Sequence, residues 1–322
     1  MFYGGEALKK KKVTIKDVAK LSGTSPMTVS RVINNHPNVS EETKKRVLNA
    51  IEKLGYRPDA DARAIRTGKT NRIGIIVSDI RNPFYSEMVG HIEDVANEKK
   101  MFITFSDTSR DVDTEKRVFE EMIHMGVDAL IIAPEGFEIE HLSRYADRTF
   151  ILSFGVHLPD LPIAEVWIDE EAGARQAGEY LKSRGVKKVE LLMGNPRKFT
   201  TLARISGFMK GFGRIERLRH FRVEYGETYR YVKEVEELPE AFFCYNDLMA
   251  AGVIKALKEK GITPGKDVLV MGYDDAYIAD ILELTTVKIP IRKMVEIAFE
   301  MIEKNKKEKI RVEPQLMVRK TA

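Results

Sequence analysis

Apolar residues follow two different spacings along the chain. Between residues 14 and 54 they recur every three or four positions in three short segments, as in amphipathic helices. From residue 72 onwards, apolar runs such as 72–79 and 129–134 alternate with longer segments of helical period. Alternating strands and helices are typical of parallel, doubly wound sheets. The pattern therefore predicts a small all-α domain followed by a bilobal α/β domain with two such sheets.

The first two N-terminal segments carry the signals that begin and end helices. Thr14, with Asp17 three residues later, can cap the first helix, and Gly23 suits the tight turn that follows it. Ser25 can cap the second helix, with Pro26 at its first position, where a missing N–H has no cost. We expect the inward-facing residues to be Ile15, Val18, Ala19 and Leu21 in the first helix and Val29, Val32 and Ile33 in the second.

A third helix completes this unit. Ser40 is placed to cap it and Gly55 to end it. Three short helices with a tight turn between the first two describe a helix-turn-helix, whose second helix contacts bases in the DNA major groove. The side chains predicted to reach base edges and phosphates are Met27, Thr28, Ser30, Arg31 and Asn34.

The charge of the chain is unevenly distributed. Residues 1–70 hold 15 Lys and Arg against 7 Asp and Glu, a net charge of +8, whereas the remainder has a net charge of −4. A basic head on a mildly acidic body indicates a polyanionic partner for the head. The alternative is a solvated, lysine-rich end with no such partner.

Several classes of protein are disfavoured by the composition and motifs. Cys244 is the single cysteine, so no disulfide can form within the chain, and a reducing compartment is expected. No apolar stretch resembles a signal peptide or a membrane span, so we expect a cytoplasmic protein. The six histidines lack metal-ligand spacing, and no phosphate-binding loop or nucleophile elbow occurs. We therefore expect no metal, no cofactor and no enzymatic activity.

The segment VTIKDVAKLSGTSPMTVSRVINNHPNVSEETKKRVLNAIEKLGYRP resembles the headpiece of the lactose/galactose repressor (LacI/GalR) family, and the resemblance continues to the C-terminus. It implies a homodimeric transcriptional regulator, most commonly a repressor, that binds a palindromic operator and responds to a small effector. The domains implied are a headpiece at 13–58, a hinge helix and linker at 59–71, and an effector-binding and dimerisation domain at 72–322. Its N-lobe would comprise about 72–164 and 290–309, and its C-lobe about 165–289 and 310–322. Residues 1–12, with KKKK at 9–12, lie outside the resemblance; we expect a disordered basic extension, and a mis-assigned start codon is the alternative.

The same resemblance assigns the residues that would contact DNA. The family's hinge pattern A-R-x-L reads here Ala62-Arg63-Ala64-Ile65, so Ile65 takes the position that wedges into a base step in the minor groove. The alternative is that Ile65 packs only against its dimer mate. The DNA-binding residues implied are Thr14, Ser25, Pro26, Met27, Thr28, Ser30, Arg31, Asn34, Tyr56, Arg63 and Ile65.

Ligands of open α/β sheets bind beyond the carboxyl ends of the strands. That rule points to the residues that follow the predicted strands: Asp79, Pro134, Asn246, Asp247, Asp274 and Asp275. The family resemblance then adds the motifs NPFY, R-x-x-G-F, YND and GYDD. The effector-binding residues implied are Asn82, Phe84, Tyr85, Thr200, Arg204, Tyr225, Asn246 and Asp274. Asp247 and Asp275 are assigned structural roles.

Two departures from the family pattern bear on the effector. Ile289 stands where the family has a glutamine that often meets the ligand, and the segment around Tyr225, Tyr229 and Tyr231 is short. These tyrosines and Trp167 could line the cleft or fill a core, and we assign only Tyr225 to the cleft. The effector expected is a sugar or sugar derivative. A nucleobase or phosphorylated metabolite acting as corepressor is the alternative, followed by a sugar-binding protein without a regulatory role.

Overall fold

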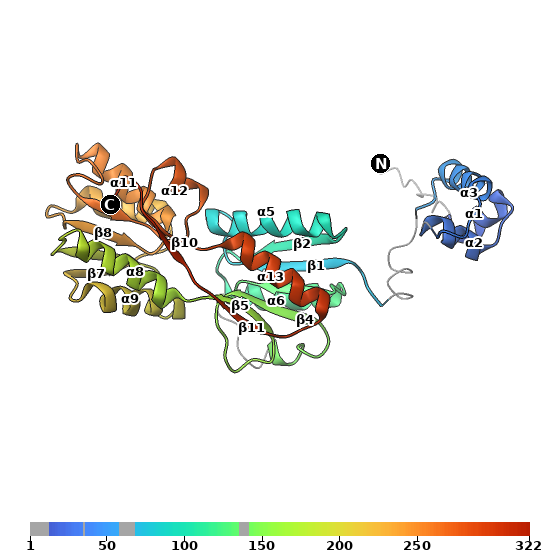
Figure 1. Ribbon diagram of the computed structural model, residues 1–322, viewed down its shortest axis with the longest axis horizontal. Helices are drawn as coiled ribbons and strands as arrows, with labels where there is room; N and C mark the ends of the chain where they lie inside the picture. Colours follow the sequence, from blue (N-terminus) through green and yellow to red (C-terminus); the bar gives the residue numbers. More distant parts are fainter. Residues whose placement is uncertain (1–12, 35, 58–67, 135–141) are drawn as a thin grey trace, which may run out of the picture. The chain divides into compact units, whose positions relative to one another are not determined.

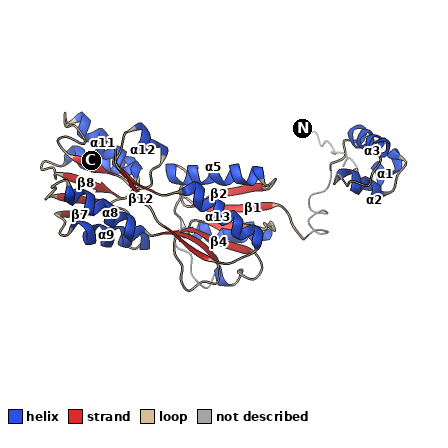
Figure 2. Cartoon of the chain, viewed as in Figure 1, coloured by secondary structure: helices blue, strands red, loops and turns tan. Residues whose placement is uncertain are grey.

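The computed structural model describes residues 13–34, 36–57, 68–134 and 142–322 (Figures 1 and 2). The chain divides into two compact units, Met1–Thr70 and Asn71–Ala322. We call the first the headpiece and the second the body. The predicted basic extension at 1–12 lies outside the described residues, as do the hinge residues Arg63 and Ile65.

The headpiece consists of three helices around a small core. The helices are α1 (Ile15–Ser22), α2 (Pro26–Ile33) and α3 (Glu41–Leu54). Ser25 Oγ accepts from the backbone N–H of Thr28 at 3.1 Å, and Gly23 ends α1 with a φ of 65°. These local signals act as the sequence predicts. The core residues are Val18, Ala19, Val29, Val32, Val47 and Ala50.

One inward-facing residue of α1 was predicted wrongly. Leu21 is 52% exposed, whereas Ser22 is buried and takes its place in the helix face that meets the core. Val18 and Ser22 are four residues apart and lie above one another on an α-helix, whereas Leu21 is rotated away from that line. Position on the helix therefore outweighs side-chain hydrophobicity here.

The N-lobe of the body is built on a six-stranded parallel sheet. Its strands are β1 (Arg72–Val77), β2 (Phe102–Asp107), β3 (Ala129–Ile132), β4 (Phe150–Gly155), β5 (Ala164–Ile168) and β11 (Lys309–Val312), in the order β11-β5-β4-β3-β1-β2. Its helices are α5 (Pro83–Glu98), α6 (Val112–His124) and α13 (Ile291–Lys304). This order confirms the doubly wound architecture that the alternating pattern predicts.

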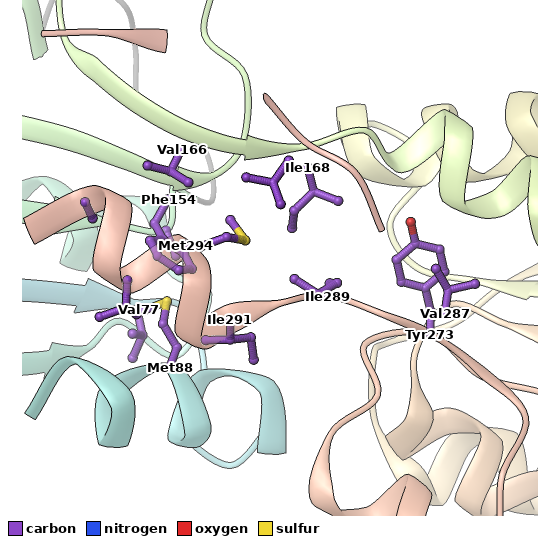
Figure 3. Packing of buried hydrophobic residues seen from close by; sticks show 14 of the residues in the cluster. Val77, Met88, Phe154, Val166, Ile168, Tyr273, Val287, Ile289, Ile291 and Met294 are labelled. Atoms are coloured by element: carbon purple, nitrogen blue, oxygen red, sulfur yellow. The ribbon is translucent and has the colours of Figure 1, made fainter. Parts of the chain in front are cut away.

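Successive residues of the central strand β1 belong to different hydrophobic clusters. Ile75 and Val77 pack in the cluster that contains α5 and α13, whereas Ile76 packs in the cluster that contains α6. Successive side chains of a strand point to opposite faces, so both faces of the sheet are buried beneath helices. Figure 3 shows Val77 near Met88 of α5 and Met294 of α13.

The C-lobe is built on a four-stranded parallel sheet in the order β7-β6-β8-β9. Its strands are β6 (Val189–Met193), β7 (Arg217–His220), β8 (Ala241–Cys244) and β9 (Leu269–Met271). Its helices are α8 (Glu170–Ser183), α9 (Phe199–Phe212), α10 (Tyr225–Glu234), α11 (Asp247–Glu259) and α12 (Tyr277–Ile281). Strands β10 (Thr286–Lys288) and β12 (Gln315–Met317) form a separate antiparallel pair.

The lobe boundaries differ from those expected. Residues 165–168 and 310–312 were assigned to the C-lobe, yet both segments are strands of the N-lobe sheet, where β5 pairs with β4 and β11 pairs with β5. The chain changes lobes only after these strands end. Ile289, on the segment between β10 and α13, lies between the N-lobe group around Met294 and the C-lobe pair of Tyr273 and Val287 (Figure 3).

Helices α8 and α9 approach each other closely because glycines face the contact. A Cβ added at Gly207 would lie 2.1 Å from the carbonyl oxygen of Glu171, and one added at Gly211 would lie 2.3 Å from that of Arg175. Only glycine permits this backbone approach. The R-x-x-G-F motif therefore has a packing role: Gly207 brings α9 against α8, so that Arg204 can meet Glu170.

Candidate functional site

A cavity of about 400 Å³ lies between the two lobes, at the ends of their strands. Both lobes contribute to its walls, as expected for a ligand site in this architecture. Six of the predicted effector-binding residues line it: Asn82, Phe84, Tyr85, Thr200, Arg204 and Asp274. The sequence motifs thus bring together residues that are almost 200 positions apart along the chain.

Helix starts position several of these side chains. Asn82 caps α5, its Oδ1 accepting from the N–H of Phe84 at 3.3 Å. Phe84 and Tyr85 follow in the first turn, with their rings edge to face at a centroid distance of 5.2 Å. Thr200 lies in the first turn of α9, and its hydroxyl is 3.0 Å from that of Tyr245. Flat aromatic faces beside amide and hydroxyl groups suit a small ligand that combines a ring with polar substituents.

Arg204 is fixed at the base of the cavity by a bidentate ion pair. Its Nε donates to one carboxylate oxygen of Glu170 at 2.8 Å and its Nη2 to the other at 3.0 Å. Nη1 donates to the backbone carbonyl of Tyr245. The side chains of Arg204 and Glu170 are 5% and 3% exposed. A buried, hydrogen-bonded pair of this kind has little freedom to reorient toward a ligand.

Two aromatic rings enclose the Arg204 guanidinium. Its central carbon lies 3.7 Å from the ring centroid of Tyr273 and 4.4 Å from that of Tyr245. Burial acts to lower the pKa of Arg204, but the charge of Glu170 and the other neighbouring groups outweighs it and holds the pKa well above the ordinary value. The arginine therefore stays charged and forms a fixed positive centre at the base of the cavity.

Asp274 is held beside Arg204 by an unusual backbone conformation. Its φ of 111° is in the region that favours glycine, and its N–H donates to the carbonyl of Val287 at 2.8 Å. Its Oδ1 lies 3.7 Å from Nη2 of Arg204. Burial raises the pKa of Asp274 well above its ordinary value, although Arg204 opposes the shift. A carboxyl with a raised pKa can hold a proton and donate a hydrogen bond to a ligand.

Asp247 is buried outside the cavity and is hydrogen-bonded to two other segments of the C-lobe. It begins α11, accepts from the Thr286 hydroxyl at 2.6 Å and from the N–H of Ala276 at 2.9 Å, and is 1% exposed. Burial raises the pKa of Asp247 to about 7, against the ordinary 3.8. Neither Asp247 nor Asp275 lines the cavity. Asp275 instead forms ion pairs with Lys288 and Arg319.

The raised pKa of Asp247 predicts a pH-dependent stability. Because the folded pKa exceeds the unfolded one, the folded state binds an extra proton between roughly pH 4 and pH 7. The associated stability is present at low pH and lost as pH rises through about 7; a shift of about three units corresponds to at most about 4 kcal/mol. We expect Asp247→Asn to reduce the fall in Tm between about pH 5 and pH 8, measured by calorimetry.

Asp160, which is exposed, provides the control for this experiment. Asp160→Asn removes a carboxylate without affecting the buried group, so its Tm should follow the wild-type pH profile. An Asp247→Asn profile as steep as that of the wild type would show that other groups, and not Asp247, govern the dependence.

Two predicted effector residues do not line the cavity. Asn246 is buried and caps α11, its Oδ1 accepting from the N–H of Met249 at 2.9 Å. Tyr225 begins α10 and lines a separate hollow over α11 and α12. The strand-end rule correctly predicts that Asn246 lies near the cavity. The path of the chain after β8 then directs its side chain toward the first turn of α11, which it caps, and away from the cavity. Tyr225 was misplaced because it lies in the first turn of α10, whose direction depends on packing against α11 and not on any local pattern.

The cavity also contains residues that the sequence reasoning missed. Glu170 follows strand β5, and Tyr245 follows strand β8, so the strand-end rule could have found both. Ile289 lines the cavity, where the family resemblance expects a glutamine. Trp167 stacks on His157 at a centroid distance of 4.5 Å and is not among the lining residues. Tyr229 and Tyr231 pack against the C-lobe core, as expected.

The headpiece displays the predicted DNA-contacting residues on and around α2. Met27 is 66% exposed, and Pro26 and Arg31 are also exposed. Thr28 and Ser30 are half-buried, and the amide of Asn34 donates to the carbonyl of Ser30 at 2.7 Å. Exposed Thr14 and Ser25 lie at the starts of α1 and α2, and half-buried Tyr56 packs against the headpiece core.

Comparisons with known proteins match both units. The description "Bacterial regulatory proteins, lacI family" fits residues 14–59, and "Periplasmic binding protein-like domain" fits residues 179–322. The chain is 31% identical over 312 residues to the HTH-type transcriptional repressor PurR of Vibrio atlanticus (strain LGP32), covering 92% of each chain. The chain belongs to the LacI family. This LacI-family protein is a DNA-binding transcription regulator and not an enzyme.

Solved structures of the family share the fold of this regulator. A lac repressor dimer bound to operator and the anti-inducer ONPF aligns with a TM-score of 0.84 at 25% identity, covering 97% of this chain and 99% of that one. A periplasmic binding protein/LacI transcriptional regulator from Alkaliphilus metalliredigens QYMF, complexed with D-xylulofuranose, aligns with a TM-score of 0.68 at 25% identity, covering 78% and 99%. Within the described residues, no helix is long and apolar enough to cross a membrane.

Proposed function

We propose that this LacI-family protein is a repressor that binds a palindromic operator as a homodimer and is controlled by a small polar effector in the interlobe cavity. The observation that carries the proposal is the cavity itself, with the buried Arg204–Glu170 pair and Asp274 at its base and aromatic rings on its walls. The complex of the Alkaliphilus relative with D-xylulofuranose supports a sugar or sugar derivative.

Contacts that bridge the lobes provide a way for the effector to act. Arg110 of the N-lobe donates from Nη2 to the carbonyl of Val223 in the C-lobe at 2.9 Å, while it pairs with Asp79 at 3.1 Å. The N–H of Tyr277 in the C-lobe donates to the carboxylate of Glu87 in α5. A ligand that contacts both lobes would favour one lobe angle over another by its differential affinity for the two arrangements.

An apolar surface supports dimerisation. Tyr277 and Ile281 of α12 are 59% and 72% exposed, and Phe102 and Phe105 of the edge strand β2 are 73% and 50% exposed. The bond between Tyr277 and Glu87 joins α12 to α5, and α5 packs beside β2 (Figure 1), so the elements that carry these side chains neighbour one another across both lobes. Exposed apolar side chains on neighbouring elements favour an interaction site there. A second copy of the chain fits a self-complementary surface.

Met27 is expected to read sequence through apolar contact. Neither Pro26 nor Met27 offers a strong donor, so contact with thymine methyl groups is the use that their chemistry allows. We expect Met27→Ala to weaken operator binding by roughly 1–3 kcal/mol while leaving affinity for random DNA nearly unchanged. Titrations on both DNAs at fixed salt measure the two affinities, and an equal loss on both would show that Met27 does not read sequence.

The proposed function is tested directly with the purified full chain. Gel shifts on the DNA upstream of its own gene, with a scrambled duplex as control, measure operator binding. A thermal-shift screen of sugars and sugar derivatives then identifies ligands that stabilise the folded state by mass action. We expect at least one such ligand to change operator affinity. A chain that binds no specific DNA, or whose operator affinity no cavity ligand alters, would contradict the proposal.

A further inference from the structure

An arginine of the N-lobe reaches the C-lobe beside the effector cavity. Arg110 follows strand β2 and lines an interlobe space of about 440 Å³, which shares Asn82 and Tyr85 with that cavity. Its Nη2 donates to Oδ2 of Asp79 at 3.1 Å, within the N-lobe, and to the backbone carbonyl of Val223, in the C-lobe, at 2.9 Å. A single nitrogen therefore joins a buried carboxylate of one lobe to a backbone oxygen of the other.

The backbone before α6 holds Arg110 in this direction. Ser109 and Arg110 have φ angles of 49° and 61°, in the left-handed region that favours glycine. The N–H of Arg110 donates to the carbonyl of Ser78 at 2.8 Å, and that of Thr108 to the carbonyl of Val77 at 3.0 Å. Two successive residues keep an unfavourable conformation only where their surroundings impose it, and such conformations cluster at functional sites.

The carbonyl that accepts from Arg110 is also held by its own lobe. The side chain of Val223 packs against the C-lobe core. The N–H of Phe221 donates to the carbonyl of Met193 at 2.9 Å, and the N–H of Arg222 donates to the carboxylate of Glu227 at 2.8 Å. Because each end of the interlobe bond is fixed within its lobe, a change of lobe angle breaks the bond instead of bending a loop.

The carboxylate that orients Arg110 belongs to the turn that carries effector-cavity residues. The carbonyl of Asp79 accepts from the N–H of Asn82 at 3.0 Å, and Asn82 and Tyr85 line the cavity. Arg110 itself does not line that cavity. A ligand that contacts Asn82 therefore acts on the same turn that positions the interlobe bond.

We propose that Arg110 is a positioning residue of the effector switch, whose bond to the Val223 carbonyl holds the lobes together and thereby sets operator affinity. We call the arrangement with this bond formed the bridged arrangement, and Glu87 adds a second bridge by accepting from the N–H of Tyr277. This inference rests on the proposed function, because it names a group that sets the lobe equilibrium on which the effector acts.

Spin labels on the full chain measure the lobe arrangement without any ligand. Cys244 is buried, so the labels attach to cysteines introduced at exposed positions, by Asp160→Cys in the N-lobe and Lys266→Cys in the C-lobe. Labelled protein is diluted into unlabelled protein, so that the distances measured by pulsed electron resonance lie within one chain.

The comparison is made in a background that lacks the second bridge. Glu87→Ala removes that bridge and raises the share of separated lobes in both proteins compared. Adding Arg110→Gln should lower the ratio of bridged to separated chains by about tenfold, the effect of losing one charge-assisted hydrogen bond. Gel shifts on the upstream DNA should show a change of operator affinity of severalfold, up to that same factor.

Arg81→Gln is the matched control. Arg81 also pairs with Asp79, at 2.8 Å, but its side chain is 75% exposed and bonds to no C-lobe group in the described part of the chain. Asp79 is the main cause of its raised pKa, and Glu224 of the C-lobe is a minor one, which salt at about 0.15 M screens. The ratio of bridged to separated chains should stay unchanged in this variant.

A conservative variant tests rescue. Arg110→Lys keeps the positive charge against Asp79, and its ammonium has three donors, enough for the carboxylate and the Val223 carbonyl. Its ratio should lie closer to that of the parent than the ratio of Arg110→Gln does. Thermal melts confirm that each variant folds.

Three outcomes would overturn the inference. The first is that Arg110→Gln leaves the ratio equal to that of its Glu87→Ala parent. The second is that Arg81→Gln lowers the ratio as much, which would assign the effect to the charge around Asp79. The third is that the ratio falls while operator affinity stays the same. In each case the proposed function stands if a sugar from the screen still changes wild-type operator affinity, and it fails separately if no cavity ligand does.

Discussion

Replacement of Ile281 by aspartate is expected to convert the protein from a dimer into monomers and to remove most of its operator affinity. Ile281 is 72% exposed at the end of α12, on the proposed dimer surface. A charge placed there would be buried without a partner in the dimer, at a cost of several kcal/mol. Each headpiece would then bind its half-site alone. Losing the linkage between two binding units weakens the overall affinity by about 10²- to 10⁴-fold.

Sedimentation and operator titration measure the two parts of this effect. Met209→Asp is the matched control, because Met209 is also exposed, at 44%, but lies on α9, which packs against the other face of the C-lobe sheet. That variant should remain dimeric and bind operator as the wild type does. A dimeric Ile281→Asp protein with unchanged operator affinity would place the dimer surface elsewhere.

Arg204→Ala is expected to destabilise the body and abolish the effector response together. The substitution leaves the Glu170 carboxylate, whose side chain is 3% exposed, without its bidentate partner. Breaking a buried pair by removing one member costs about 3–5 kcal/mol, which for a domain of this size corresponds to a fall in Tm of roughly 10 °C. The space between the rings of Tyr245 and Tyr273 would also be emptied, which removes the support beneath the ligand.

A second variant separates the charge from the packing. Arg204→Met combined with Glu170→Gln removes both charges while filling much of the same volume, so its Tm should lie closer to the wild type than that of Arg204→Ala. Effector binding, measured by calorimetry, should remain lost in both. An Arg204→Ala protein that melts at the wild-type temperature would show that the buried pair contributes little to stability.

Some of the cavity residues could be predicted from sequence motifs, whereas others depend on the tertiary structure. Motifs near strand ends located Asn82, Phe84 and Asp274, because parallel strands bring their carboxyl ends to one edge of each sheet. The pairing of Arg204 with Glu170 was not predicted: the strand-end rule can locate Glu170, but it does not show that a residue 34 positions later on another helix meets it. Its position depends on the close α8–α9 packing that Gly207 permits.

What the sequence alone determined is local. The cap at Ser25, the turn at Gly23 and the alternation of strand and helix periods are set within a few residues, because each acts through backbone hydrogen bonds or the repeat of one element. The helix-turn-helix and the doubly wound lobes followed from these patterns, whereas the resemblance to the LacI/GalR family followed from the ordered motifs of residues 13–58. The exposed Leu21 shows that the apolar pattern predicts the helix but not every residue that faces its core.

The tertiary structure decided the features that depend on pairing between distant segments. Strand β11 joins β5 through contacts such as Lys309 with Glu165, so the lobe to which each belongs cannot be deduced from either segment alone. Tertiary packing also decides that the Asn246 side chain caps α11 and that Tyr225 lies outside the cavity. The direction of a side chain depends on how its whole helix or strand packs, and that packing is set only when the hydrophobic core of each lobe forms.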